Sequence, residues 1–230
     1  VSWTLMEGSE VEAIVATADA GLMLAGNGFA NRITGRSGSD TLVGHGGDDM
    51  LDGLRGADLL IGGLGNDTYD VDHAGDRVTE LAGQGTLDRI ITTVSHTLSD
   101  DAEIERMQAG NTAGAVALIG NGFAQRLIGG RSADTLVGGG GNDSLTGGEG
   151  SDLFVFSVGF GRDEITDFAA GSGGPDVIRF VSGSFTSFAE VLANTVQRGT
   201  HALITTSGGD TLVLLGVSRA ALHADDLVFG

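Results

Sequence analysis

The sequence predicts an all-β fold: a parallel β-roll, a form of β-solenoid, in two blocks, followed by a C-terminal β-rich cap with a short helix. The main observation is a nine-residue repeat with glycine first, aspartate sixth and a large apolar residue eighth. It runs as GRSGSDTLV, GHGGDDMLD, GLRGADLLI and GGLGNDTYD over 35–70, and as GGRSADTLV, GGGGNDSLT and GGEGSDLFV over 129–155. The apolar residues lack helical spacing, and 41 glycines in 230 residues far exceed ordinary globular usage.

Each nonamer is expected to form a tight glycine turn followed by a three-residue strand whose middle side chain points inward. Two nonamers then complete one circuit, so that loops eighteen residues apart stack at the same edge. The side chains expected to face inward are Leu42, Leu51, Leu60, Tyr69, Leu136, Leu145 and Phe154.

A larger repeat sets the domain organisation. VSWTL at 1–5 recurs as VSHTL at 94–98, and GNGFANRIT at 26–34 recurs as GNGFAQRLI at 120–128. We therefore expect a first unit over 1–93 with a β-roll at 26–79, and a second unit over 94–155 with a β-roll at 120–155. A sequence that begins at a unit boundary without methionine favours a fragment of a longer array over a processed product.

Residues 156–230 are expected to form a compact cap rather than more coil. Ser187 and Glu190 are spaced as a capping box, which predicts a short helix through about Thr195. The strand-like segments 201–206 and 210–215 flank Ser-Gly-Gly and predict a hairpin.

Composition excludes several functions. The net charge is −19 and every basic residue is arginine, so nucleic acid is not an expected partner. The sequence has no run of eighteen apolar residues, so it predicts no membrane-spanning helix. The sequence contains neither HExxH nor GxSxG, and we expect no enzymatic activity from this chain.

The residue types in the turns favour calcium. Glycine accepts positive φ and lets carbonyl oxygens approach an ion, while aspartate adds a hard anionic oxygen on a short stem. Ca²⁺ takes six to eight such oxygens, whereas Mg²⁺ demands tight octahedral geometry and Zn²⁺ favours histidine or cysteine. A flexible Gly/Asp linker is the alternative, but linkers have no reason to keep an apolar residue in phase.

The nonamers resemble the RTX repeats of the calcium-binding β-roll family, strongly over 26–76 and 120–155. In that family one loop supplies oxygens at positions two and four with its aspartate, and the loop eighteen residues later supplies positions one and three with its own. The resemblance implies three such pairs of loops and therefore at least three Ca²⁺ ions. The implied ligands are Arg36, Gly38 and Asp40 with Gly53, Arg55 and Asp58; His45, Gly47 and Asp49 with Gly62, Leu64 and Asp67; and Gly130, Ser132 and Asp134 with Gly147, Glu149 and Asp152. The non-acidic residues, and Glu149, would bind through their backbone carbonyls.

Further candidates lie at the ends of the two rolls. Asp76 continues the register opposite Asp58, and Asp143 is left to pair with either the loop at 120–125 or the turn at Asp163–Asp167. The degenerate nonamers that open each roll have Asn31 and Gln125 where aspartate is expected, which favours packing over ion binding there.

The resemblance implies a secreted module that folds on extracellular calcium and supports type I secretion and stability of a larger exported protein. Its expected partners are calcium, the type I exporter, which would read a secretion signal within 156–230, and an N-terminal functional domain. Two alternatives remain: the non-catalytic C-terminal part of a secreted hydrolase or epimerase, and a structural link in an adhesin or surface-layer array.

Overall fold

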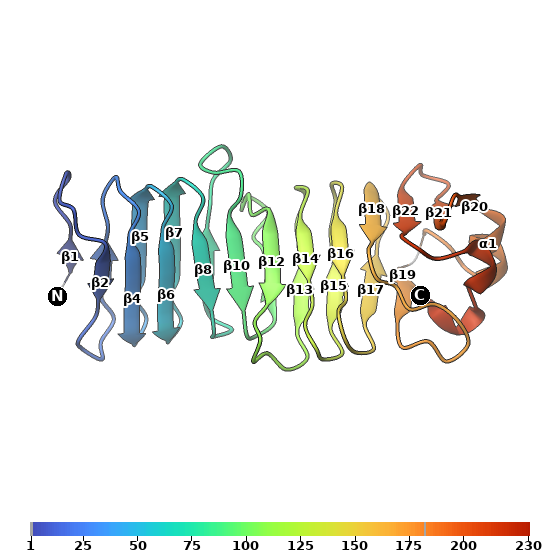
Figure 1. The fold of residues 1–230 in the computed structure, drawn as a ribbon, viewed down its shortest axis with the longest axis horizontal. Coiled ribbons are helices and arrows are strands. Elements are labelled where there is room, and N and C mark those ends of the chain that lie inside the picture. Colours follow the sequence, from blue (N-terminus) through green and yellow to red (C-terminus); the bar gives the residue numbers. More distant parts are fainter. Residues whose placement is uncertain (1, 182) are drawn as a thin grey trace. The chain divides into compact units, whose positions relative to one another are not determined.

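A computed structural model describes residues 2–181 and 183–230. Two compact units make up the chain, Val1–Gly110 and Asn111–Gly230. Both are built almost entirely from short strands connected by glycine-rich turns (Figure 1). The all-β, parallel β-roll expected from the nonamers is confirmed.

In the first unit the chain alternates between two parallel sheets. One sheet has the order β1-β3-β5-β7-β9, and the other contains β2-β4-β6-β8-β10-β12. The strands of this unit are β1 Trp3–Thr4, β2 Ala13–Val15, β3 Met23–Ala25, β4 Arg32–Ser37, β5 Thr41–Gly46, β6 Met50–Arg55, β7 Leu59–Leu64, β8 Thr68–Val71, β9 Arg77–Thr79, β10 Arg89–Thr92, β11 His96–Thr97 and β12 Arg106–Ala109.

The register of these strands confirms that two nonamers make one circuit. Ile33 of β4 pairs with Leu51 of β6, and Leu42 of β5 pairs with Leu60 of β7, each eighteen residues further on. The same register aligns Leu51 with Tyr69. Residues in equal positions of the repeat therefore lie directly above one another.

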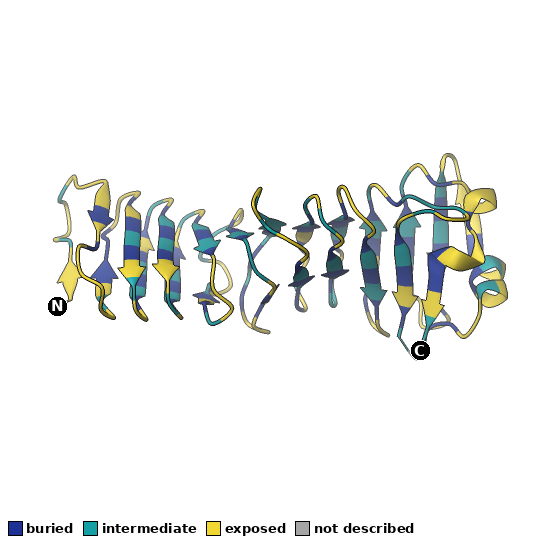
Figure 2. Ribbon diagram, turned by 90° about the horizontal axis from the view of Figure 1, so that it is seen from below, coloured by how far each residue is buried: buried dark blue, intermediate teal, exposed yellow. Residues whose placement is uncertain are grey.

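The core is a column of eighth-position side chains. All of the residues expected to point inward are fully buried, namely Leu42, Leu51, Leu60, Tyr69, Leu136, Leu145 and Phe154. Within most strands of the rolls a buried residue alternates with more exposed neighbours, as the banded strands in Figure 2 show. Burial of this column supplies the hydrophobic stabilisation that the glycine-rich turns do not.

The second unit repeats the arrangement and ends in a hairpin and a helix. Its strands are β13 Ala117–Ile119, β14 Arg126–Ile128, β15 Thr135–Val137, β16 Ser144–Thr146, β17 Leu153–Phe156, β18 Arg162–Ile165, β19 Val177–Phe180, β20 Thr195–Arg198, β21 His201–Thr205, β22 Thr211–Leu214 and β23 Leu227–Phe229. The sheets follow the orders β13-β15-β17-β19-β23 and β14-β16-β18-β22-β21-β20. In the second of these sheets the pairing is parallel from β14 to β22. Strand β21 then pairs antiparallel with both β22 and β20. The hairpin expected around Ser-Gly-Gly is thus confirmed, between β21 and β22.

The helix α1 spans Phe188–Ala193 and ends two residues before the expected Thr195. The Ser187 side chain accepts a hydrogen bond from the Glu190 N–H at 3.3 Å, which confirms the N-cap. The Glu190 carboxylate binds the Thr186 N–H and hydroxyl rather than completing the reciprocal capping box. Two 3₁₀ turns, Arg219–Ala221 and Ala224–Asp226, follow later in the chain.

The coil extends beyond the boundaries expected from nonamer phase. Strands β10 and β12 continue the parallel sheet past residue 79, while β18, β19 and β23 add parallel strands within 156–230. Insertions in the connecting loops interrupt the nine-residue count without changing the strand geometry. The division between compact units also lies at Gly110, whereas the sequence repeat divides the chain after residue 93.

Candidate metal centre

Sixth-position aspartates of the first unit form ladders along the turns. On one side the backbone N–H of Leu22 donates to Asp40 Oδ1 at 2.7 Å, Asp40 N–H to Asp58 Oδ1 at 2.7 Å, and Asp58 N–H to Asp76 Oδ1 at 3.0 Å. Each carboxylate is therefore held by the turn that precedes it by one coil. To accept this backbone hydrogen bond, the side chain at position six must offer a carboxylate or amide oxygen.

A second ladder follows the turns between β5 and β6 and between β7 and β8. Asn31 N–H donates to Asp49 at 2.6 Å, Asp49 N–H to Asp67 at 2.7 Å, and Asp67 N–H to Asp88 at 2.7 Å. The ladder ends with Asp88 N–H donating to Glu105 Oε2 at 2.6 Å. The turns of this ladder lie at the opposite ends of the strands from those of the first (Figure 1).

The second unit contains the same two ladders. One joins Val116, Asp134, Asp152 and Asp176, through N–H to Oδ1 distances of 2.9, 2.8 and 3.0 Å. The other joins Gln125, Asp143 and Asp163, at 2.7 and 2.8 Å. The structure thus places Asp143 between both of its expected partners, the loop at 120–125 and the turn that begins at Asp163.

Most ladder carboxylates keep one oxygen without a donor. Among the described residues, the buried oxygens that lack a hydrogen-bond partner include Oδ2 of Asp49, Asp58, Asp67, Asp88, Asp143, Asp152 and Asp163. Each of these side chains is at most 2% exposed. A buried anionic oxygen without a donor is costly, so this pattern calls for a cation.

The first-position glycines shape the space beside these oxygens. A Cβ on Gly44 would lie 2.1 Å from Asp49 Oδ2 and 2.6 Å from the carbonyl oxygen of Gly62, one coil later. Similarly, a Cβ on Gly129 would lie 2.3 Å from the Gly147 carbonyl oxygen and 2.7 Å from Asp134 Oδ2. Glycine thus lets a carboxylate and a carbonyl from successive coils approach one another. The oxygen-only donor set fits Ca²⁺.

Burial also perturbs the acid–base chemistry of the ladders. It raises the pKa of Asp49 to about 7, with smaller contributions from the charges of Asp67 and Asp48, and the pKa of Asp58 to about 6. In the second unit burial raises the pKa of Asp143 to about 6 and of Asp163 to about 8. The ionised ladders are therefore unfavourable unless a positive charge joins them.

The structure brings together the two loops of each pair expected from the sequence. Gly38 N–H donates to the Arg55 carbonyl at 3.1 Å in the first pair, and His45 lies in register with Gly63 in the second. In the third pair Glu149 N–H donates to the Gly130 carbonyl at 3.0 Å. The aspartates of each pair are adjacent rungs of a ladder, and Asp76 follows Asp58. Ligation by the individual oxygens remains a prediction.

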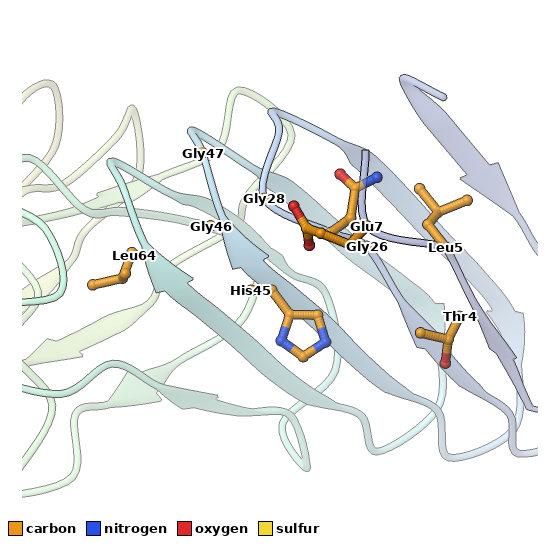
Figure 3. A pocket seen from close by; sticks show the side chains of 10 residues that line it. Thr4, Leu5, Glu7, Gly26, Gly28, His45, Gly46, Gly47 and Leu64 are labelled. Atoms are coloured by element: carbon orange, nitrogen blue, oxygen red, sulfur yellow. The ribbon is translucent and has the colours of Figure 1, made fainter. Parts of the chain in front are cut away.

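Side chains at the non-acidic positions are directed away from the ladders. Arg36 forms an exposed ion pair with Asp19 at 2.8 Å, and Leu64 is 61% exposed. His45 and Leu64 line an open pocket of about 490 Å³ on the outside of the stacked loops, with Gly26, Asn27 and Gly47 (Figure 3).

The neutral residues at the opening of each roll are satisfied by hydrogen bonds. Asn31 Oδ1 accepts from the Asn27 N–H at 2.9 Å, and Asn31 Nδ2 donates to the Val11 carbonyl at 2.8 Å. Gln125 Oε1 accepts from the Asn121 N–H at 3.2 Å, and its Nε2 donates to Asn121 Oδ1 at 2.7 Å. Both side chains are therefore held in their turns by hydrogen bonds to neighbouring loops and residues.

The nine-residue repeat did not predict several members of the ladders. Asp88, Glu105, Asp163 and Asp176 follow at spacings of 21, 17, 20 and 24 residues. The signal that finds them is an acid two residues before a buried apolar side chain. The pairs are Asp88 with Ile90, Glu105 with Met107, Asp163 with Ile165 and Asp176 with Ile178.

The fold and the ladders define a class of protein: a parallel β-roll whose turns bring together buried aspartate oxygens and backbone carbonyls from successive coils. Comparison with known proteins specifies the class further. Residues 25–60, 46–72 and 119–154 match the RTX calcium-binding nonapeptide repeat. The chain therefore contains RTX repeats, which bind calcium.

Two known proteins are similar to this chain. The endo-1,3-1,4-beta-glycanase EglC of Rhizobium meliloti is 39% identical over 72 residues, which is 31% of this chain and 15% of the glycanase. The extracellular lipase LipA from Serratia marcescens is 20% identical with a TM-score of 0.45, over 94% of this chain and 41% of the lipase. The chain thus spans less than half the length of each. Within the described residues, no helix is long and apolar enough to cross a membrane.

Proposed function

We propose that this chain is a calcium-dependent folding module of a larger exported protein, which stays unfolded during type I secretion and folds outside the cell. The observation that supports this is the set of buried ladder oxygens without donors. Without a cation, these stacked carboxylates repel one another in a chain with a net charge of −19. With calcium, they become ligands.

The energetics support a switch rather than a small adjustment. One site filled at one hundred times its Kd stabilises the folded state by about 2.7 kcal/mol. Three such sites, the minimum that we propose, would add about 8 kcal/mol, which is comparable to the roughly 5–15 kcal/mol that stabilises a whole domain. Calcium alone is therefore sufficient to decide whether the chain folds.

Circular dichroism in EDTA and in millimolar Ca²⁺ tests the proposal, with Mg²⁺ at the same concentration as the control. We expect β-sheet signal in Ca²⁺, and a largely disordered chain in EDTA and in Mg²⁺. Equal β content in EDTA and in Ca²⁺ would contradict calcium-dependent folding.

The export role is tested separately with the chain fused to a reporter in a bacterium that has a type I exporter. We expect export to require residues 156–230, where we place the secretion signal, and to survive deletion of 35–70. Equal export of a fusion that lacks 156–230 would contradict that placement.

A second candidate is the non-catalytic part of a secreted glycan-degrading enzyme. The alignment with the Rhizobium glycanase favours it, since the match covers only 15% of that protein. Any activity would then belong to residues outside this chain. An assay of this chain alone against mixed-linkage glucans should give no hydrolysis, whereas measurable hydrolysis would overturn the non-catalytic assignment.

A further inference from the structure

Glu80 occupies a position that every regular nonamer of this chain gives to glycine. Strand β9 pairs in register with β7, which sets Glu80 opposite Gly62 at position one. A Cβ on Gly62 would lie 2.0 Å from Asp67 Oδ2, so the regular loop has no room for a side chain. After Glu80 the next ladder aspartate, Asp88, comes eight residues later instead of five, and this longer loop accommodates the glutamate.

A second departure from the repeat lies beside the first. Tyr69, the only tyrosine in the chain, replaces the leucine or phenylalanine found at the eighth position of the other regular nonamers. Its hydroxyl donates a hydrogen bond to Glu80 Oε2, and both side chains are buried. Tyr69 therefore fixes the orientation of the Glu80 carboxylate.

Glu80 thereby joins two rungs of a ladder. One carboxylate oxygen from each of Asp67, Glu80 and Asp88 lies within 4.8 Å of the others, and all three residues are buried. One oxygen of each is held by a donor: the Asp49 N–H, the Tyr69 hydroxyl and the Asp67 N–H. The remaining oxygens, Asp67 Oδ2, Glu80 Oε1 and Asp88 Oδ2, have no partner among the described residues.

A backbone oxygen lies close to this group. A Cβ on Gly85 would be 2.1 Å from Asp88 Oδ2 and 2.3 Å from the Gly65 carbonyl oxygen. Gly85 thus allows a carbonyl and a carboxylate to approach from successive coils, as the first-position glycines do elsewhere. The donor set consists entirely of hard oxygens.

We propose that Asp67, Glu80 and Asp88 bind one additional calcium ion, at a site that the nonapeptide pattern does not contain. The regular loops combine two aspartates with backbone carbonyls, whereas this site combines three side-chain carboxylates. Three buried anions without a countercharge are strongly unfavourable, and a divalent ion offsets most of that charge. Ca²⁺ suits an all-oxygen site of irregular geometry better than Mg²⁺ or Zn²⁺.

The test counts bound calcium on the full chain by equilibrium dialysis and elemental analysis. We expect Glu80→Gln to bind one Ca²⁺ fewer per chain than the unmodified protein. Glu80→Gly, which restores the residue of the regular loops, should show the same loss. Glu103→Gln is the matched control, because Glu103 is a partly exposed glutamate that accepts the Gly83 N–H at 2.7 Å. It should lose no ion.

If both Glu80 variants bind as many calcium ions per chain as the unmodified protein, the proposed site is wrong. The three side chains would then be a cluster of protonated carboxyl groups. A measurement on the unmodified chain covers the case in which the variants do not fold. Crystals grown with Tb³⁺ should give an anomalous peak among the three carboxylates. Peaks at the nonapeptide loops without one at Glu80 would refute this site while leaving calcium binding by the repeats intact.

Discussion

Adjacent aspartates in one loop allow the calcium ladder to be tested with an internal control. Asp49 is a buried rung whose Oδ1 accepts the Asn31 N–H at 2.6 Å and whose Oδ2 has no donor among the described residues. Asp48, its neighbour in sequence, is exposed. We predict that Asp49→Asn changes stability in opposite directions with and without calcium, while Asp48→Asn has little effect in either condition.

The magnitude without calcium follows from the cost of ionising Asp49. Burial raises its pKa from 3.8 to about 7. Three pKa units correspond to about 4 kcal/mol, of which we take about half because a glycine-rich turn can relax and admit water around an ionised carboxylate. At pH 8 the neutral amide should therefore stabilise the calcium-free fold by about 2 kcal/mol. An asparagine oxygen can still accept the Asn31 N–H.

With calcium the sign reverses. Loss of one site that is filled at one hundred times its Kd removes about 2.7 kcal/mol, which exceeds the gain of about 2 kcal/mol and leaves a net destabilisation of about 0.7 kcal/mol. Asp48→Asn should remain within about 0.5 kcal/mol of the unmodified protein in both conditions, as is usual for exposed positions.

The two conditions need different assays. Urea unfolding followed by circular dichroism measures the calcium-bound protein, and folding induced by trimethylamine N-oxide in EDTA measures the calcium-free chain. The reasoning is refuted if Asp49→Asn destabilises the protein equally in both, because Asp49 would then act only through packing and hydrogen bonding.

Two further predictions concern pH and the turns. In EDTA, the stability of the fold should be greatest near pH 4 and fall as pH rises through 6 to 8. Burial raises the folded-state pKa of Asp49 to about 7, of Asp143 to about 6 and of Asp163 to about 8, so the folded chain binds more protons than the unfolded one. The affinity for calcium should rise over the same pH range, and a calcium-free stability that increases with pH, measured by trimethylamine N-oxide titration, would contradict this account. Gly56→Ala should destabilise the calcium-bound fold by about 2–4 kcal/mol, because φ is +145° and the new Cβ would lie 1.7 Å from the Gly38 carbonyl oxygen. The control is Gly209→Ala, where φ is also positive, at +93°, but no atom lies within 4 Å of the new Cβ, so the substitution should cost about 1 kcal/mol in urea unfolding. Equal losses in the two variants would show that close packing of the turns is unimportant.

Periodicity made much of this fold predictable. An apolar residue at the eighth position of each nonamer can be buried every time only if successive nonamers form opposite walls of a coil, and Leu42, Leu51 and Leu60 are buried in that way. The hairpin and the N-cap at Ser187 were also predictable, because turn and cap residues act locally. The end of the helix and the extent of the coil were not, since they depend on contacts with distant strands.

The sequence by itself determined the class of fold, the stacking distance of eighteen residues and the pairing of the regular loops, because each follows from a repeat that needs no long-range information. Only the tertiary structure showed that Asp88, Glu105, Asp163 and Asp176 continue the ladders, since loops of varying length connect them to the coil. It alone brought Glu80 together with Asp67 and Asp88 and against the hydroxyl of Tyr69. Hydrogen bonds from one coil to the next, rather than distance along the chain, decide which carboxylates meet.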